Sequence, residues 1–147
     1  MERHGLDYDA PAPFATGKSL GEALLTPTRI YVRNCLAAIR AFPDAVRALA
    51  HITGGGLTEN IPRVMPEGLR LDASALADWD FPPMFAWLQK TGQIGTEEMW
   101  RTFNCGIGMA IVVNASAAEA VQRFLTQAGE TVFRIGQVVK NSAIAEQ

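Results

Sequence analysis

Apolar residues recur every three or four positions along several parts of the chain, and this spacing predicts amphipathic helices. Ser19, followed three residues later by Glu22, has the pattern of a capping box and predicts a short helix that ends near Leu25. Residues that start and stop helices flank the other helical patterns. We expect further helices from Thr26 and Pro27 to about Ala41 with Val32, Leu36 and Ile39 buried, from an Asp80 cap through Pro82 and Pro83 to Gly92, from Thr96 onwards, and from a Ser116–Glu119 capping box to Gly129.

Other apolar stretches lack helical spacing and predict strands in the second half of 46–53 and at 68–71, 106–113 and 131–139. The nearly continuous apolar run from Gly106 to Val113 predicts a central strand that is covered on both faces. This strand, the following helix and the last strand predict a right-handed βαβ unit. The expected fold class is α/β or α+β, with a mixed sheet and helices packed on it, in a single domain over residues 1–147.

Three consecutive glycines, Gly54, Gly55 and Gly56, follow the first predicted strand. Glycine adopts positive φ angles and lets a ligand approach the backbone, and ordering three of them is costly in entropy. N–H groups at the start of a helical turn attract anions, and Arg63 would add a bidentate contact to phosphate or carboxylate. The glycines therefore predict an anion site, with a tight turn that binds nothing as the alternative.

The same stretch also resembles a known family signature. The residues concerned are Thr53–Gly56 and Glu59–Arg63, and further agreement is found in order at Leu24–Val32, Phe85–Gln89 and Met99–Met109. Together these segments resemble aminoimidazole ribonucleotide synthetase, also called phosphoribosylformylglycinamidine cyclo-ligase, an ATP-dependent enzyme of purine biosynthesis. The segments span most of the chain, which makes the resemblance much more specific than a triple glycine.

Composition and charge narrow the possible partners. The chain has 147 residues, of which 48% are hydrophobic and 19% are charged, as in an ordinary globular domain with a real core. A net charge of −2 without a cluster of basic residues argues against a nucleic-acid partner. No apolar run reaches the ~18 residues that cross a bilayer, so we expect no membrane partner and a cytoplasmic location. Cys35 and Cys105 have no metal-like spacing, which favours reduced thiols.

The resemblance implies a two-domain, homodimeric enzyme. In that family a ferredoxin-like N-terminal domain carries acidic metal ligands and much of the ATP site, and a C-terminal domain completes the active site. This chain resembles the C-terminal domain with its first strand and helix missing, so the sheet is expected to have an exposed edge that favours self-association. ATP and Mg²⁺ belong to the complete enzyme. We expect this chain alone to hold neither and to be inactive, because Asp72, Asp78 and Asp80 form no acidic cluster.

The implied reaction begins when the amide oxygen of formylglycinamidine ribonucleotide attacks the γ-phosphate of ATP. The amidine nitrogen then closes the ring and phosphate leaves, which requires donors to phosphate and a cleft that excludes water. The candidate substrate- and phosphate-binding residues are Thr53, Gly54, Gly55, Gly56, Asn60, Arg63, Asn104 and Gly106. For Asn60 and Arg63, bracing of the turn is an equal alternative. His51 is a weak catalytic candidate, and a structural role is favoured because the sequence places no carboxylate beside it.

Two other functions stay open at this point. The chain is a small non-catalytic binding or regulatory module if the glycines only turn the backbone. The kinases and synthetases that share the two-domain architecture are a third possibility, which the segment Glu59–Arg63 disfavours because it resembles the cyclo-ligase specifically.

Overall fold

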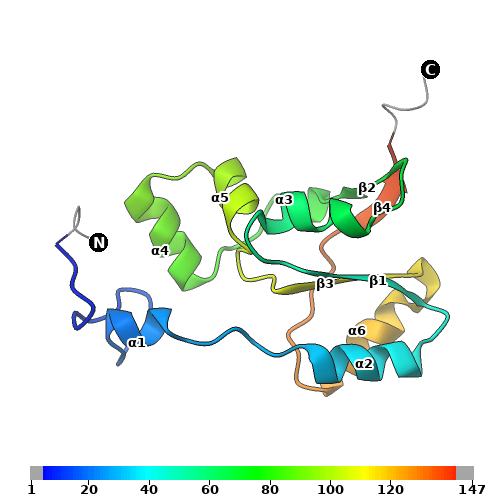
Figure 1. The fold of residues 1–147 in the computed structure, drawn as a ribbon, viewed down its shortest axis with the longest axis horizontal. Helices are drawn as coiled ribbons and strands as arrows, with labels where there is room; N and C mark the ends of the chain where they lie inside the picture. Colours follow the sequence, from blue (N-terminus) through cyan, green and yellow to red (C-terminus); the bar gives the residue numbers. More distant parts are fainter. Residues whose placement is uncertain (1–4, 142–147) are drawn as a thin grey trace.

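The computed structural model describes residues 5–141, which form helices around two short antiparallel sheets (Figure 1). Its elements in chain order are α1 (Leu20–Leu24), α2 (Val32–Ala41), β1 (Val46–His51), α3 (Gly56–Asn60), η2 (Pro62–Val64), β2 (Leu69–Asp72), η3 (Ser74–Leu76), α4 (Pro83–Gly92), α5 (Thr96–Thr102), β3 (Met109–Val113), η4 (Ala115–Ala117), α6 (Ala118–Gln127) and β4 (Gln137–Lys140).

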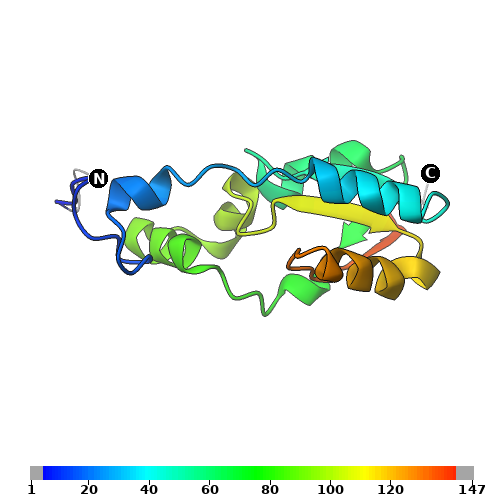
Figure 2. The same ribbon diagram turned by 90° about the horizontal axis from the view of Figure 1, so that it is seen from below.

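The sheet formed by β1 and β3 lies between two layers of helices. Helices α2 and α6 run side by side across one face, and α3 lies on the other (Figure 1; Figure 2). Side chains of successive β3 residues pack on opposite faces of the sheet. Ala110 belongs to a core with Ile52 and Leu57, whereas Ile111 packs against the core of α2 and α6. This alternation follows from the period of two along a strand. The prediction that both faces of this strand are covered is confirmed, whereas its prediction as a central strand is wrong, because among the described residues β3 pairs with β1 alone.

Both sheets pair antiparallel. His51 lies opposite Met109 in the pair β1–β3, and Leu69 lies opposite Lys140 in the pair β2–β4. The predicted βαβ unit is wrong, because β3 and β4 belong to different sheets. The last strand begins at Gln137 because the chain before it packs elsewhere: the ring of Phe133 lies 4.8 Å from that of Trp79. The expected α/β or α+β class is confirmed, but in place of one mixed sheet the described residues form two small antiparallel sheets with helices packed on them.

Local capping chemistry determines the start of α1. The backbone N–H of Glu22 donates to Oγ of Ser19 at 3.2 Å, and the N–H of Ser19 donates to Oε2 of Glu22 at 2.8 Å. The predicted capping box is therefore confirmed, and its hydrogen bonds lower the pKa of Glu22. The second expected box is not formed: α6 starts after Ala117, which makes no side-chain cap. Asp80 likewise does not cap α4, whose N-cap is Pro82.

Helix α2 starts at Val32, five residues later than the predicted first helical residue, Pro27. The residues before it have neither helical nor strand structure and form a linker, 26–31, that runs along the molecule from α1 to α2 (Figure 1). Tertiary contacts made by Arg29 and Tyr31 outweigh the local start signal at Thr26 and Pro27. Val32 and Leu36 are exposed instead of buried, because the face of α2 that meets α6 passes through Ala38.

Candidate functional site

The triple glycine turns the chain from β1 into α3, and its members differ in their surroundings. Gly55 and Gly56 have φ angles of 92° and 54°, which side chains rarely adopt. A Cβ on Gly56 would lie 2.0 Å from the carbonyl oxygen of Trp100, so the end of α5 requires glycine there. A Cβ on Gly54 would meet nothing within 4 Å. Of the three glycines, only Gly54 faces open space where a ligand can approach.

Asn60 is buried beneath this loop and holds it in shape. Its Nδ2 lies within hydrogen-bond distance of the carbonyl oxygens of Thr53, Gly54 and Gly56, at 3.4, 3.2 and 2.7 Å. Its Oδ1 accepts from Oγ1 of Thr53 at 3.4 Å and from Nη1 of Arg63 at 3.2 Å. The amide is thus engaged on both sides by the protein itself. This geometry supports the alternative in which Asn60 and Arg63 brace the turn.

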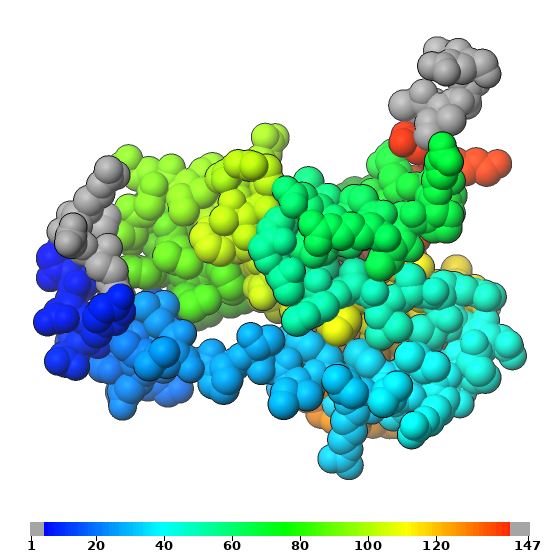
Figure 3. All heavy atoms as spheres, viewed as in Figure 1, coloured from blue at the N-terminus to red at the C-terminus, as the bar shows by residue number. Residues whose placement is uncertain are grey.

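A groove of about 490 Å³ opens beside Gly54. Its walls come from four places in the sequence. They are formed by Thr26, Thr28, Arg29 and Tyr31 of the linker, by His51, Ile52, Thr53 and Gly54 at the end of β1, by Met84 and Phe85 of α4, and by Thr102 at the end of α5 with Phe103, Asn104 and Gly108 after it. In the space-filling view the hollow lies between the linker, in blue, and the region of α4 and α5, in green and yellow (Figure 3).

The groove brings together only part of the residues that the sequence singles out. His51, Thr53, Gly54 and Asn104 line it, whereas Gly55, Gly56, Asn60, Arg63 and Gly106 do not. A Cβ on Gly106 would meet Pro82 at 2.5 Å, so that glycine permits packing against the start of α4. Its N–H donates to Oδ1 of Asn104 at 3.0 Å and fixes that side chain at the edge of the groove.

Sequence reasoning missed the linker residues of the groove. The ring of Tyr31 lies 6.0 Å from that of His51, and a Cβ on Gly108 would overlap the hydroxyl of Tyr31. Phe85 and Phe103 form another ring pair, with centroids 6.0 Å apart. The family-like segments Leu24–Val32, Phe85–Gln89 and Met99–Met109 contain nearly all of these residues. That resemblance was the available signal, since nothing in the local pattern of Tyr31 predicts a contact with Gly108.

The lining of the groove combines polar and apolar residues, and its charged side chains are basic. Among the described residues that line it, Arg29 and His51 are the basic side chains and there is no aspartate or glutamate. The carboxylate of Glu130 lies behind Arg29, with Oε2 at 2.9 Å from Nε of Arg29. In residues 5–141, no three histidine, cysteine or acidic side chains are grouped to hold a metal ion. The basic side chains of the groove suit an anionic ligand.

Neither cysteine is a prepared nucleophile. Cys105 has no exposed surface, and burial raises the pKa of its thiol to about 11. Its Sγ donates to the carbonyl oxygen of Met99 at 3.3 Å. Partial burial, and then the negative charge of Glu130, raise the pKa of Cys35. Both thiols stay protonated near neutral pH, so the chemistry of the site does not depend on a thiolate.

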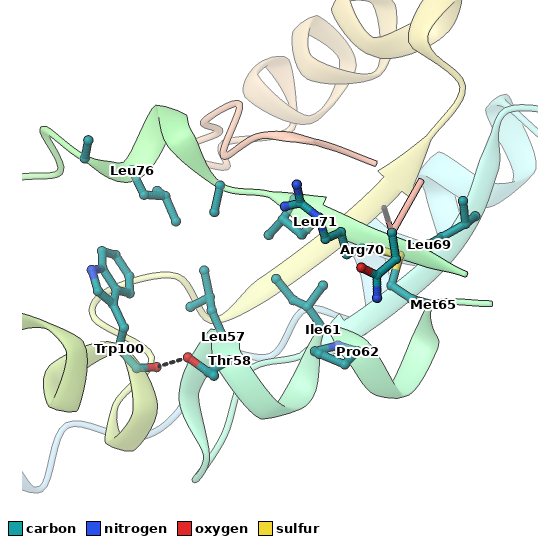
Figure 4. A pocket seen from close by; sticks show the side chains of 13 residues that line it. Leu57, Thr58, Ile61, Pro62, Met65, Leu69, Arg70, Leu71, Leu76 and Trp100 are labelled. Atoms are coloured by element: carbon teal, nitrogen blue, oxygen red, sulfur yellow. Dashed lines mark hydrogen bonds between the residues drawn. The ribbon is translucent and has the colours of Figure 1, made fainter. Parts of the chain in front are cut away.

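A second groove, of about 600 Å³, lies on the far side of α3, between that helix and β2 (Figure 4). Leu57, Ile61, Leu71 and Leu76 point into it, and Trp100 closes one end (Figure 4). Its lining is mostly apolar and has few polar groups that converge on one point. Sites for polar ligands need such groups to orient the ligand. The groove beside Gly54 is therefore the better candidate for a site that binds a phosphorylated compound.

The described helices and a comparison with known families bear on what kind of protein this is. No helix in the described part of the chain is both long enough and apolar enough to span a membrane. The model of the AIR synthase related protein, C-terminal domain, family matches residues 1–146. This match covers nearly the whole chain and agrees with the helices and small antiparallel sheets described above. The chain therefore belongs to the AIR synthase related family, in which it corresponds to the C-terminal domain.

Proposed function

We propose that this chain supplies the substrate groove of an ATP-dependent cyclo-ligase that converts formylglycinamidine ribonucleotide to aminoimidazole ribonucleotide. One observation carries the proposal. The segments that resemble the cyclo-ligase are far apart in the sequence, yet four of the five, Leu24–Val32, Thr53–Gly56, Phe85–Gln89 and Met99–Met109, contribute to the wall of one groove, and the fifth, Glu59–Arg63, holds the loop beside it. Segments that share a family pattern and meet at one cavity are best explained by a ligand that they bind in common.

The lining residues suit a ribonucleotide. Hydroxyl groups of Thr26, Thr28, Thr53 and Thr102 offer hydrogen bonds to a sugar, and Arg29 offers a positive charge to a phosphate. In the proposed reaction the amide oxygen bonds to the γ-phosphorus of ATP while ADP leaves. The amidine nitrogen then attacks the amide carbon that bears the phosphorylated oxygen, which closes the ring and releases phosphate. Groups in the groove bind and orient the ribonucleotide for these steps. Correct positioning of the reacting atoms lowers the activation barrier.

We assign the binding of ATP and its metal ion to another domain of the enzyme. Because residues 5–141 contain no grouping of histidine, cysteine and acidic side chains that suits a metal ion, we assign no Mg²⁺ ligand and derive no step through Mg²⁺ here. The proposal places ATP and Mg²⁺ in the complete enzyme, a homodimer in the cytoplasm. Aminoimidazole ribonucleotide formation by this chain therefore requires an ATP- and metal-binding domain of the same family.

The test is reconstitution. The chain is fused to, or mixed with, the ATP- and metal-binding domain of a family member, and ATP-dependent formation of aminoimidazole ribonucleotide is measured. We expect activity, and we expect Thr53→Val and Asn104→Ala to reduce kcat/KM about tenfold or more, as for loss of a polar contact to the reacting substrate. Thr126→Val, an exposed position on α6, is the matched control and should leave kcat/KM unchanged.

The opposite result is equally informative. If the reconstituted protein is folded and binds ATP but forms no product, the proposal fails and the chain is a non-catalytic binding module. If product forms but Thr53→Val and Asn104→Ala behave like Thr126→Val, the reaction takes place outside this groove.

A further inference from the structure

Arg29 anchors one wall of the groove, although the sequence patterns did not single it out. The linker residues from Thr26 to Ile30 are exposed, so hydrophobic burial does little to hold this segment in place. Arg29 ties it down: Nη2 donates to the carbonyl oxygen of Gly129 at 3.2 Å, and Nε lies 2.9 Å from Oε2 of Glu130. The guanidinium is thereby held in one position at the edge of the groove.

Glu130 is the fixed point of this arrangement. Only 14% of its side chain is exposed, compared with 56% for Arg29. Its other oxygen, Oε1, accepts a short hydrogen bond from Nδ2 of Asn34 on α2. A carboxylate engaged on both oxygens orients the guanidinium more strictly than a surface ion pair between two mobile chains.

The contacts that anchor Arg29 involve only some of the N–H groups of its guanidinium. An arginine side chain carries five N–H donors, and the contacts to Gly129 and Glu130 use Nε and one N–H of Nη2. Arg29 also lines the groove, and no acidic residue is among the described residues that line it. The carboxylate of Glu130 contacts Nε from behind, which leaves Nη1 and the second N–H of Nη2 for an anionic ligand. The arrangement therefore combines a pre-oriented cationic fork with a cavity that favours negative charge.

The far wall of the groove has a different character. Phe85 and Phe103 lie there, on α4 and after α5, and their rings are suited to contact the flat apolar face of a heterocycle or its precursor. Arg29 lies at the opposite side, where the linker meets α2 and the end of α6. A ligand with an anionic group at one end and a planar group at the other fits this polarity.

We propose that Arg29 binds a phosphate group of the ligand in the groove, and that Glu130 is a positioning residue that orients the Arg29 guanidinium. This inference rests on the proposed function in that it assigns the groove to substrate. A sugar phosphate and a nucleoside triphosphate both carry such a group, and the separate probes below distinguish these two sources. The planar guanidinium suits phosphate as a bidentate donor, which a lysine ammonium cannot reproduce.

The experiment measures binding to the full chain by NMR titration and by calorimetry, with inorganic phosphate, ribose 5-phosphate, ribose and metal-free ATP as separate probes. We expect ribose 5-phosphate to shift the backbone amide signals of Thr53, Gly54 and Gly108, and ribose to bind far more weakly. Arg29→Gln should weaken ribose 5-phosphate binding about tenfold or more, the range for a hydrogen bond to a charged group. Arg40→Gln, an exposed position on α2, removes the same charge and should have no effect.

Two variants separate contact from anchoring. Glu130→Gln breaks the same tie but leaves the guanidinium, so we expect a smaller loss of affinity than for Arg29→Gln. If the two losses are equal, Arg29 is only an anchor and the proposal is overturned. Arg29→Lys keeps the charge and should still weaken binding at least about threefold because the fork is lost. Unchanged affinity in Arg29→Lys also overturns the proposal, and this variant decides the matter if Arg29→Gln does not fold.

The source of the phosphate and the status of the proposed function are read from separate measurements. A loss confined to ribose 5-phosphate indicates the substrate phosphate, and a loss confined to metal-free ATP indicates the nucleotide. Failure of the proposed function would appear as Arg29-dependent phosphate binding without product formation in the reconstituted protein. Failure of the present inference would appear as phosphate binding that does not depend on Arg29, whether or not product forms.

Discussion

Replacing Gly56 by alanine should be much more damaging than the same change at Gly54, two residues earlier in the same loop. Gly56 has a φ angle of 54°, and an added Cβ would lie 2.0 Å from the carbonyl oxygen of Trp100 and 2.7 Å from that of Phe103. Both neighbours are backbone atoms at the end of α5, so they cannot move aside as a flexible side chain can. Gly54 has neither a positive φ nor a neighbour within 4 Å.

The magnitude follows from these two penalties. A non-glycine residue in the left-handed region costs about 1–2 kcal/mol, and inserting an atom into a packed site costs about 1–3 kcal/mol. We therefore expect Gly56→Ala to lower the free energy of unfolding by roughly 2–5 kcal/mol. Gly55→Ala should be intermediate, because its φ is 92° but its Cβ would meet the movable side chain of Glu59.

The measurement is thermal and urea unfolding of the three alanine variants in parallel. Each kcal/mol lowers Tm by about 2–4 °C in a domain of this size, so Gly56→Ala should unfold roughly 5–15 °C lower and Gly54→Ala within about 2 °C of the parent. Equal Tm values for Gly54→Ala and Gly56→Ala would refute the reasoning. They would show that the loop does not pack against α5 as described.

Three other predictions test separate features. Asn60→Ala should lower the free energy of unfolding by about 2–3 kcal/mol, because the loop carbonyls lose a buried donor. Urea unfolding measures this free energy, and a change below about 0.5 kcal/mol would contradict the prediction. Burial raises the pKa of Cys105 to about 11 from an ordinary 9.0, so the unfolded thiol ionises first and stability should fall as pH rises from 9 towards 11. Cys105→Ala should reduce that slope in chemical unfolding measured against pH, and Cys35, whose pKa is also raised, accounts for a remaining part. Ile30 and Val32 are 82% and 62% exposed, and within residues 5–141 β1 pairs with β3 alone, so we expect self-association at micromolar concentration. Sedimentation equilibrium should show it weakened in Ile30→Ser/Val32→Ser, and a monomeric parent chain would contradict the expectation.

The elements that sequence reasoning predicted well are those whose signal is local. The Ser19–Glu22 capping box and the strand from Met109 to Val113 depend on hydrogen bonds and side-chain periodicity over a few residues. The start of α2 was predicted five residues too early, because Thr26 and Pro27 have the local pattern of a helix start. The βαβ unit was predicted from element order alone, which does not say which strands pair.

The sequence by itself determined the family, the class of fold and the loop around Gly54, because these follow from short patterns that can be read along the chain. Only the tertiary structure decided which residues share a groove. Arg29 meets the end of α6 across 100 positions of sequence, and Tyr31 covers Gly108 although no local pattern links them. Contacts between such distant positions depend on how whole elements pack, and single-sequence periodicity carries no information about them.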